Sequence, residues 1–229
     1  RRDFDGNPDG PAGEKISTAS MDDPPSDAIT VMAWVKPETL SGGDKGIAVK
    51  GGVFLLELES DNNWGIDFTA YTANGLAEHQ PTGCSVPAGQ WSHIAGTYDG
   101  TAAKTYLNGV QCLGQLNKTS TISSTTQPYE MGYSTYASDR WFDGNIDEVA
   151  VFSAALSESE ILALYEKGAM GASYCTMAPY PPLITSSPVM TGTIGTAYQY
   201  NVEAVGNPDP TYTLTASPTG MTINPTTGL

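Results

Sequence analysis

Apolar and polar residues alternate in several short runs along the chain. The first run, Ile29 to Val35, places every second residue on one face, and Pro37 follows it. This alternation is typical of a strand with one buried face, because successive side chains of a strand point to opposite sides of the sheet. Two further runs, Val53 to Glu59 and Trp64 to Thr69, flank the polar turn at residues 61–63. They predict a hairpin.

A second hairpin is predicted further along the chain. Its strands are Trp91 to Tyr98 and Lys104 to Leu107, and they are joined through Asp99-Gly100. The turn Asn108-Gly109 closes the second strand. Asp-Gly and Asn-Gly favour the positive-φ turns that match the twist of paired strands. Gly144 to Phe152 is the last strand that we expect in this set.

A short helix is predicted after these strands. Ser157 and Glu160 form a capping box, in which each side chain satisfies a free backbone N–H at the start of a helix. The apolar stripe of the helix consists of Ile161, Leu164 and Tyr165. Since Gly168 follows the stripe, we expect the helix to stop there and to lie against the sandwich.

The domain organisation follows from a change in pattern after the helix. Residues 169–182 lose all periodicity and end in Ala-Pro-Tyr-Pro-Pro, as expected of a linker. We therefore predict a β-sandwich over 1–168 and a second, β-rich domain over 183–229. The ~45 residues of the second domain are too few to close a sandwich, which normally takes ~100 residues. We interpret it as part of a module.

Within the second domain the expected elements are short. The run Ala197 to Ala204 predicts a strand, and turns are expected at Gly206-Asn207-Pro208 and at Pro218-Thr219-Gly220. The exposed edge of such a strand is a hazard unless another strand pairs with it.

Composition and charge narrow the classes of partner. The 229 residues include 25 glycines, 16 prolines and 12 tyrosines, which fits many short strands joined by tight turns. The net charge is -15 and no Lys/Arg cluster is present, so nucleic acid is excluded as a partner. The carboxylates form either a solvated surface or, locally, a cation site. No run approaches the ~18 apolar residues of a membrane span, so no membrane insertion is expected.

The three cysteines lack the spacing of a zinc site. Cys84 and Cys112 are candidates for a disulfide because both are expected near a hairpin, but Cys175 leaves an odd thiol and the sequence does not fix the pairing. Asn117 begins a glycosylation sequon, which is used only in a cell with the required machinery.

Six segments in register resemble the bacterial laminin-G-like family of concanavalin-A-like jelly rolls. They are Phe4-Asp5-Gly6, Thr30 to Pro37, Gly89 to Ala95, Thr97 to Gly100, Tyr106 to Gly109 and Phe142 to Val149. The resemblance covers about residues 1–167 and implies an all-β, antiparallel jelly-roll β-sandwich with one short C-terminal helix. The tail resembles the immunoglobulin-like repeats of large bacterial surface proteins, which act as spacers.

The resemblance also implies a structural calcium ion at one edge of the sandwich. Family members hold it with an acidic side chain of the last strand and with groups near the first strand. The matching residues are Asp147 and, beside the first strand, Asp5. Calcium takes ~6–8 oxygen ligands, which carboxylates, carbonyls and water can supply. The alternative is that Asp147 accepts hydrogen bonds from turn amides.

One strand carries an acidic trio. Glu57, Glu59 and Asp61 have period-2 spacing, which aims them at the same face. Neighbours at this spacing lie ~6.5–7 Å apart, within the range that inverting glycosidases use. However, the order Glu-Leu-Glu-Ser-Asp differs from the pattern of concanavalin-A-like glucanases. A glycoside hydrolase using Glu57 and Glu59 is therefore the weaker alternative to a solvated strand face.

The two histidines do not form a nucleophilic triad. His93 is expected in a hairpin strand and His79 in a loop, and neither has a Gly-x-Ser-x-Gly elbow nearby. We interpret His93 as a packed structural residue.

The region from Tyr133 to Trp141 combines aromatic and polar side chains. Sugars bind to exposed aromatic faces and to nearby carboxylate or amide groups, so this region is the candidate ligand site. The candidate residues are Tyr133, Tyr136, Asp139, Arg140 and Trp141, extended by Trp64 and Tyr71. The alternative is that Tyr133 and Trp141 cover the edge of the core.

Together these features predict a non-catalytic carbohydrate-binding or adhesion module. We expect it to be a monomer within a large secreted or cell-surface protein, with a polysaccharide or glycoconjugate as its partner. A purely architectural domain without a ligand is the alternative from another class.

Overall fold

The computed structural model describes most of the chain. The described residues are 2–5, 15–18, 27–134, 140–174, 180–207 and 210–229. They divide into two units, Arg1–Tyr174 and Cys175–Leu229. No helix among the described residues is long and apolar enough to cross a membrane.

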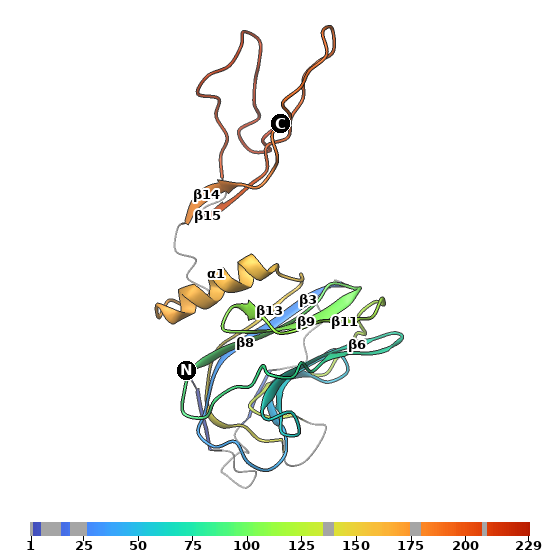
Figure 1. The fold of residues 1–229 in the computed structure, drawn as a ribbon, viewed down its shortest axis with the longest axis vertical. Helices are drawn as coiled ribbons and strands as arrows, with labels where there is room; N and C mark the ends of the chain where they lie inside the picture. Colours follow the sequence, from blue (N-terminus) through green and yellow to red (C-terminus); the bar gives the residue numbers. More distant parts are fainter. Residues whose placement is uncertain (1, 6–14, 19–26, 135–139, 175–179, 208–209) are drawn as a thin grey trace. The chain divides into compact units, whose positions relative to one another are not determined.

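Two antiparallel sheets make up the first unit (Figure 1). One sheet has seven strands in the order β1-β13-β3-β8-β9-β10, with β11 also paired to β9. Its strands are β1 (Arg2–Asp5), β3 (Ile29–Pro37), β8 (Ser92–Tyr98), β9 (Ala102–Leu107), β10 (Val110–Gln111), β11 (Leu116–Asn117) and β13 (Asp143–Phe152). We call this sheet A.

The other sheet, sheet B, has six strands in the order β2-β12-β4-β5-β6-β7. Its strands are β2 (Ile16–Ser17), β4 (Lys45–Lys50), β5 (Phe54–Glu59), β6 (Gly65–Thr72), β7 (Gly75–His79) and β12 (Tyr129–Met131). All pairings in both sheets are antiparallel. This architecture confirms the expected jelly-roll class of β-sandwich.

The main core lies between the two sheets. Alternate residues of the longer strands enter it, including Val31 and Val35 of β3 and Leu56 and Leu58 of β5. Glycine at Gly96 is required by this packing, because a Cβ there would lie 2.1 Å from Cγ of Phe68 on the facing sheet. The alternation read from the sequence therefore corresponds to one inward face in each strand.

The helix α1 (Glu158–Ala169) covers the outer face of sheet A (Figure 1). The capping box between Ser157 and Glu160 is present. The prediction that Gly168 stops the helix was wrong, because the helix continues to Ala169. Gly168 is instead a close-packing position, since a Cβ there would lie 2.2 Å from Nε1 of Trp34. The positive-φ residue beyond the helix is Gly171.

A second, smaller cluster fills the space under the helix. It consists of Met32, Ala95, Tyr106, Ile161 and Tyr174, and Trp34 packs against it. His93 lies here and is fully buried. Its ring contacts Trp34, Tyr165 and Tyr174 at centroid distances of 5.5, 6.0 and 6.1 Å. His93 is thus a packed residue, as expected.

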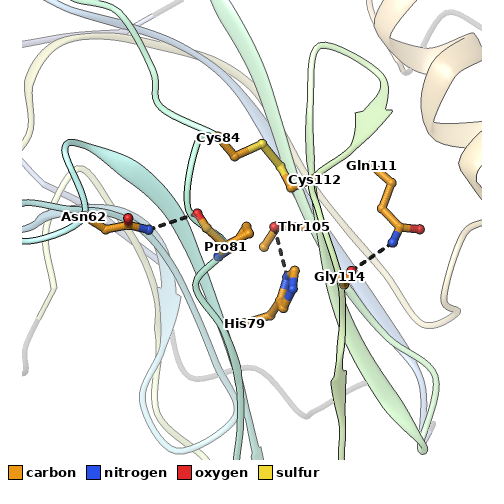
Figure 2. Close-up of a disulfide and its surroundings, with 8 residues drawn as sticks. All are labelled: Asn62, His79, Pro81, Cys84, Thr105, Gln111, Cys112 and Gly114. Atoms are coloured by element: carbon orange, nitrogen blue, oxygen red, sulfur yellow. Dashed lines mark hydrogen bonds between the residues drawn. A yellow bond between two sulfur atoms is a disulfide. The ribbon is translucent and has the colours of Figure 1, made fainter.

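A disulfide joins Cys84 to Cys112 at the edge where β7 faces β9 and β10 (Figure 2). Cys84 comes after β7 of sheet B and Cys112 follows β10 of sheet A, so the bond links the two sheets. Next to it, Nδ1 of His79 lies 3.1 Å from Oγ1 of Thr105. The expectation of a loop at His79 was wrong, because this residue ends β7 and is buried. Cys175 lies outside the described residues.

The second unit contains a two-stranded antiparallel sheet of β14 (Tyr180–Ile184) and β15 (Ala204–Asn207). The predicted strand at 197–204 was wrong, since only its last residue is in a strand, and the turn expected at 206–208 was wrong because Gly206 and Asn207 belong to β15. The turn at 218–220 is confirmed, since Met221 N–H donates to the carbonyl of Pro218.

Candidate functional site

The backbone around Arg140 is fixed against the start of β4. The carbonyl oxygen of Arg140 accepts hydrogen bonds from the N–H groups of Gly46 and Ser134, both at 3.3 Å. A Cβ on Gly46 would lie 2.5 Å from the backbone N of Ser134, so only glycine permits this approach. The backbone of Arg140 is thereby held by two hydrogen bonds, in addition to the contacts of its side chain.

Two aromatic rings, from Tyr133 and Trp141, lie next to each other in the same region. Their backbones form an isolated antiparallel bridge, and their ring centroids are 4.2 Å apart at an interplanar angle of 32°. Both residues are partly exposed. The ammonium group of Lys15 lies 5.4 Å from the Tyr133 ring centroid, within cation–π range. We call Tyr133, Arg140 and Trp141 the rim; Tyr136 and Asp139, also predicted here, lie outside the described residues.

The Arg140 side chain binds two carboxylates. It donates through Nη1 to Oε1 of Glu57 and forms an ion pair through Nη2 with Oδ2 of Asp44 at 3.0 Å. The other Asp44 oxygen accepts hydrogen bonds from the backbone N–H and the hydroxyl of Ser60, both at 2.8 Å. Arg140 therefore connects the rim to sheet B.

Glu57 and Asp67 form a buried carboxyl pair on sheet B. They lie directly opposite each other in the β5–β6 register, and each residue is 1% exposed. Because their neighbours Leu56, Leu58 and Phe68 enter the core, both carboxyl groups face away from sheet A. Burial raises the pKa of Glu57 to about 7, although Arg140 opposes the shift. Burial also raises the pKa of Asp67 to about 8, to which the charge of Glu57 contributes.

Glu59 extends this row of acidic groups. It follows Glu57 by two residues on the same face of β5, and burial raises its pKa. The amide of Gln80 donates to Oε2 of Glu59 at 3.2 Å and to Glu78 at 3.0 Å. Asp61, the third member of the predicted trio, is exposed in the turn beyond β5 and does not share the face.

The hydrolase alternative requires accessible carboxyl groups. Glu57 is almost fully buried and its Oε1 is occupied by Arg140, so this oxygen is not available to a sugar. A glycosidase needs one carboxyl to protonate the leaving group and another to act at the anomeric carbon. The geometry of Glu57 and Glu59 thus favours a packed ion-pair network over a catalytic pair.

The remaining predicted ligand residues, Trp64 and Tyr71, lie next to and on strand β6. Trp64 is partly buried and packs against the main core, with the ammonium of Lys45 6.0 Å from its ring centroid. Tyr71 lies near the other end of β6, on the same face as Asp67 and four residues from it. Four residues of strand span ~13 Å, so one sugar unit cannot contact both Tyr71 and the groups around Asp67.

The predicted calcium ligands do not come together. Asp5 of β1 pairs with Asp143 of β13, whereas Asp147 lies four residues further along β13, ~13 Å away. Oδ1 of Asp147 accepts a hydrogen bond from Glu148 N–H at 3.0 Å, next to a bulge where Glu148 has φ 47°. Asp147 lines a cavity of about 410 Å³ with Trp34 and Trp91.

Sequence reasoning missed two members of the acidic row, Asp44 and Asp67. Asp44 precedes β4 and Asp67 lies on β6, so both reach Glu57 only through strand pairing. The alternation of β6 could have indicated the position of Asp67, because Ile66 and Phe68 enter the core and Asp67 therefore lies on the opposite face of the strand.

Two facing antiparallel sheets, an outer helix and a rim of aromatic and charged side chains define a lectin-like β-sandwich. The family model described as the concanavalin A-like lectin/glucanases superfamily matches residues 9–162. The chain belongs to this superfamily, in its laminin-G-like branch.

The chain is similar to several known proteins at low sequence identity. Mouse pappalysin-1 is 26% identical over 175 residues, which is 66% of this chain and 10% of pappalysin-1, so the chain spans about a tenth of that curated relative. Among solved structures, the SAP-like pentraxin of Limulus polyphemus has a TM-score of 0.55 at 17% identity, covering 71% of this chain and 80% of the pentraxin. The CBM40 domain of Ruminococcus gnavus IT-sialidase, bound to α2,3 sialyllactose, has a TM-score of 0.51 at 14% identity, covering 66% and 96%. These likenesses concern the fold.

Proposed function

We propose that the first unit is a non-catalytic glycan-binding or adhesion module of a larger extracellular protein. The observation that carries the proposal is the partly exposed Tyr133–Trp141 ring pair, held beside Arg140 at the rim. Aromatic faces stack on the apolar C–H surfaces of pyranose rings, and charged groups bind their hydroxyl or carboxylate substituents. The rim offers both kinds of contact within one short stretch of backbone.

Two further observations support this setting. The R. gnavus domain of similar fold is described in complex with α2,3 sialyllactose, which makes sialylated glycans a reasonable first choice of ligand. The Cys84–Cys112 disulfide is typical of proteins in oxidising compartments, outside the cytoplasm. We further propose that residues 183–229 of the second unit form part of an immunoglobulin-like spacer. We also propose that the chain is a monomer.

A glycan array tests the proposal. The full chain is screened against polysaccharides and sialylated oligosaccharides, together with Trp141→Ala and Trp91→Ala. Trp91 is the matched control because it is a partly exposed tryptophan, 36% exposed, outside the rim. We expect Trp141→Ala to weaken binding by about tenfold or more and Trp91→Ala to leave it unchanged.

The other outcomes identify the alternatives. A folded chain that binds nothing on the array would contradict the proposal and favour an architectural domain. Equal losses of glycan affinity in Trp141→Ala and Trp91→Ala would indicate that the rim is not the binding surface. Release of reducing ends from a bound glycan, abolished by Glu57→Gln, would identify a hydrolase.

A further inference from the structure

Three carboxyl groups at the start of β4 and the end of β5 are close enough to share one ion. Asp44, Glu57 and Glu59 each place an oxygen within 4.8 Å of the others. Calcium binds oxygen ligands at 2.3–2.6 Å, so two ligands on opposite sides of one ion are up to ~5.2 Å apart. The three oxygens therefore fit around a single calcium ion without rearrangement of the backbone.

A second observation comes from the neighbouring strand. Within the described part of the chain, Oδ1 of Asp67 and Oε2 of Glu57 are buried and have no hydrogen-bond partner. Asp67 lies opposite Glu57 and faces the same side of sheet B, toward the three carboxyl groups. A buried carboxylate oxygen without a partner is costly in free energy. A cation between β5 and β6 would supply a partner to both oxygens.

The local charge points the same way. Arg140 brings one positive charge to a row of four carboxyl groups, Asp44, Glu57, Glu59 and Asp67. It contacts one oxygen of Asp44 and one of Glu57, and Oε2 of Glu57 stays unpaired. One guanidinium cannot compensate all four groups once they are ionised, whereas a divalent ion would compensate two further charges.

We propose that Asp44, Glu57 and Glu59, with Asp67 behind them, bind one Ca²⁺ ion on the outer face of sheet B. Calcium fits better than magnesium because Mg²⁺ demands near-octahedral geometry at 2.0–2.1 Å and keeps several waters. The ion would fix β4, β5 and β6 to one another beside the rim. This site is separate from Asp147, and it does not depend on the proposed glycan binding.

Two measurements on the full chain test the site: calorimetric titration and terbium luminescence. The chelator-treated protein is titrated first with Ca²⁺ and then with Tb³⁺, which Trp64 can sensitise because it adjoins Gly65, the residue paired with Glu59. We expect one ion per chain, a melting temperature that rises with Ca²⁺, and displacement of Tb³⁺ by Ca²⁺.

Variants distinguish this site from general acidic attraction. Asp44→Asn combined with Glu59→Gln should weaken Ca²⁺ binding by about tenfold or more. Glu59→Gln alone keeps both Arg140 ion pairs, so it serves if the double variant does not fold. Asp61→Asn removes an equal charge from the exposed turn beyond β5, and we expect it to bind like the natural chain.

Three results would overturn the proposal. The first is a folded natural chain whose melting temperature and heat signal ignore Ca²⁺. The second is an equal loss of affinity in Asp61→Asn and Glu59→Gln, which would indicate diffuse attraction. The third is loss of binding in Asp147→Asn with full binding in Glu59→Gln, which would place the ion at the sandwich edge.

Discussion

Protonation of His93 should set the acid limit of stability in the first unit. His93 is fully buried beneath α1, and burial alone lowers its pKa to about 4. In the unfolded chain a histidine has a pKa near ~6.5. The rings in contact with it are those of Trp34, Tyr165 and Tyr174. Below ~pH 6.5 the unfolded chain therefore binds one proton more than the folded chain does.

The magnitude follows from proton linkage. Between the two pKa values the free energy of unfolding falls by ~1.4 kcal/mol for each unit decrease in pH. From pH 7.5 to pH 4.5 this amounts to about 2.5 kcal/mol attributable to His93. The variant His93→Leu does not titrate, so its free energy of unfolding should lack this component, and the difference between the two proteins should change by that amount.

Urea unfolding at several pH values measures the difference. The four tryptophans, Trp34, Trp64, Trp91 and Trp141, all lie in the first unit, so their fluorescence reports that unit within the full chain. Titration of the other histidine, His79, is present in both proteins and cancels. A gap between natural chain and His93→Leu that stays constant from pH 7.5 to pH 4.5 would refute the burial argument. If the free energies of unfolding of the two proteins also differ by a pH-independent amount, that part of the difference reflects repacking around residue 93.

Two further predictions concern the core and the disulfide. Replacing both Cys84 and Cys112 by serine should lower the free energy of unfolding by ~3.6 kcal/mol, from the loop entropy of their separation of 28 residues, as measured by urea unfolding; a loss below ~1 kcal/mol would contradict this. Gly96→Ala should destabilise the sandwich by about 1–3 kcal/mol through the clash with Phe68, and adding Phe68→Leu should cost less than the two single losses summed; strict additivity would refute the contact.

The fold was predictable where one face of a strand is buried and the other is polar. Strands β3, β5, β6 and β13 were found within a few residues of their ends, since alternation marks an inward face. Strand β4 was missed because its sequence, Lys-Gly-Ile-Ala-Val-Lys, shows no alternation of apolar and polar residues. In the second unit the predicted strand at 197–204 was placed too early in the chain, since β15 begins at Ala204.

The candidate site was predictable only within single segments. Glu57 and Glu59 share one strand, and Tyr133, Arg140 and Trp141 fall within one short segment of the sequence, so sequence spacing brought the members of each group together. The link between the two groups is the ion pair of Arg140 with Glu57, across 83 positions. Such a contact depends on strand register and loop geometry, which a single sequence does not specify.

The helix over sheet A has a practical consequence for dissecting this protein. Met32, Ala95 and Tyr106 are shielded from water by Ile161 and Tyr174. A truncation that ends before Ser157 would lay bare this apolar strip on an otherwise intact sheet, and such strips drive self-association. Any shortened version intended to retain solubility should therefore extend through Tyr174.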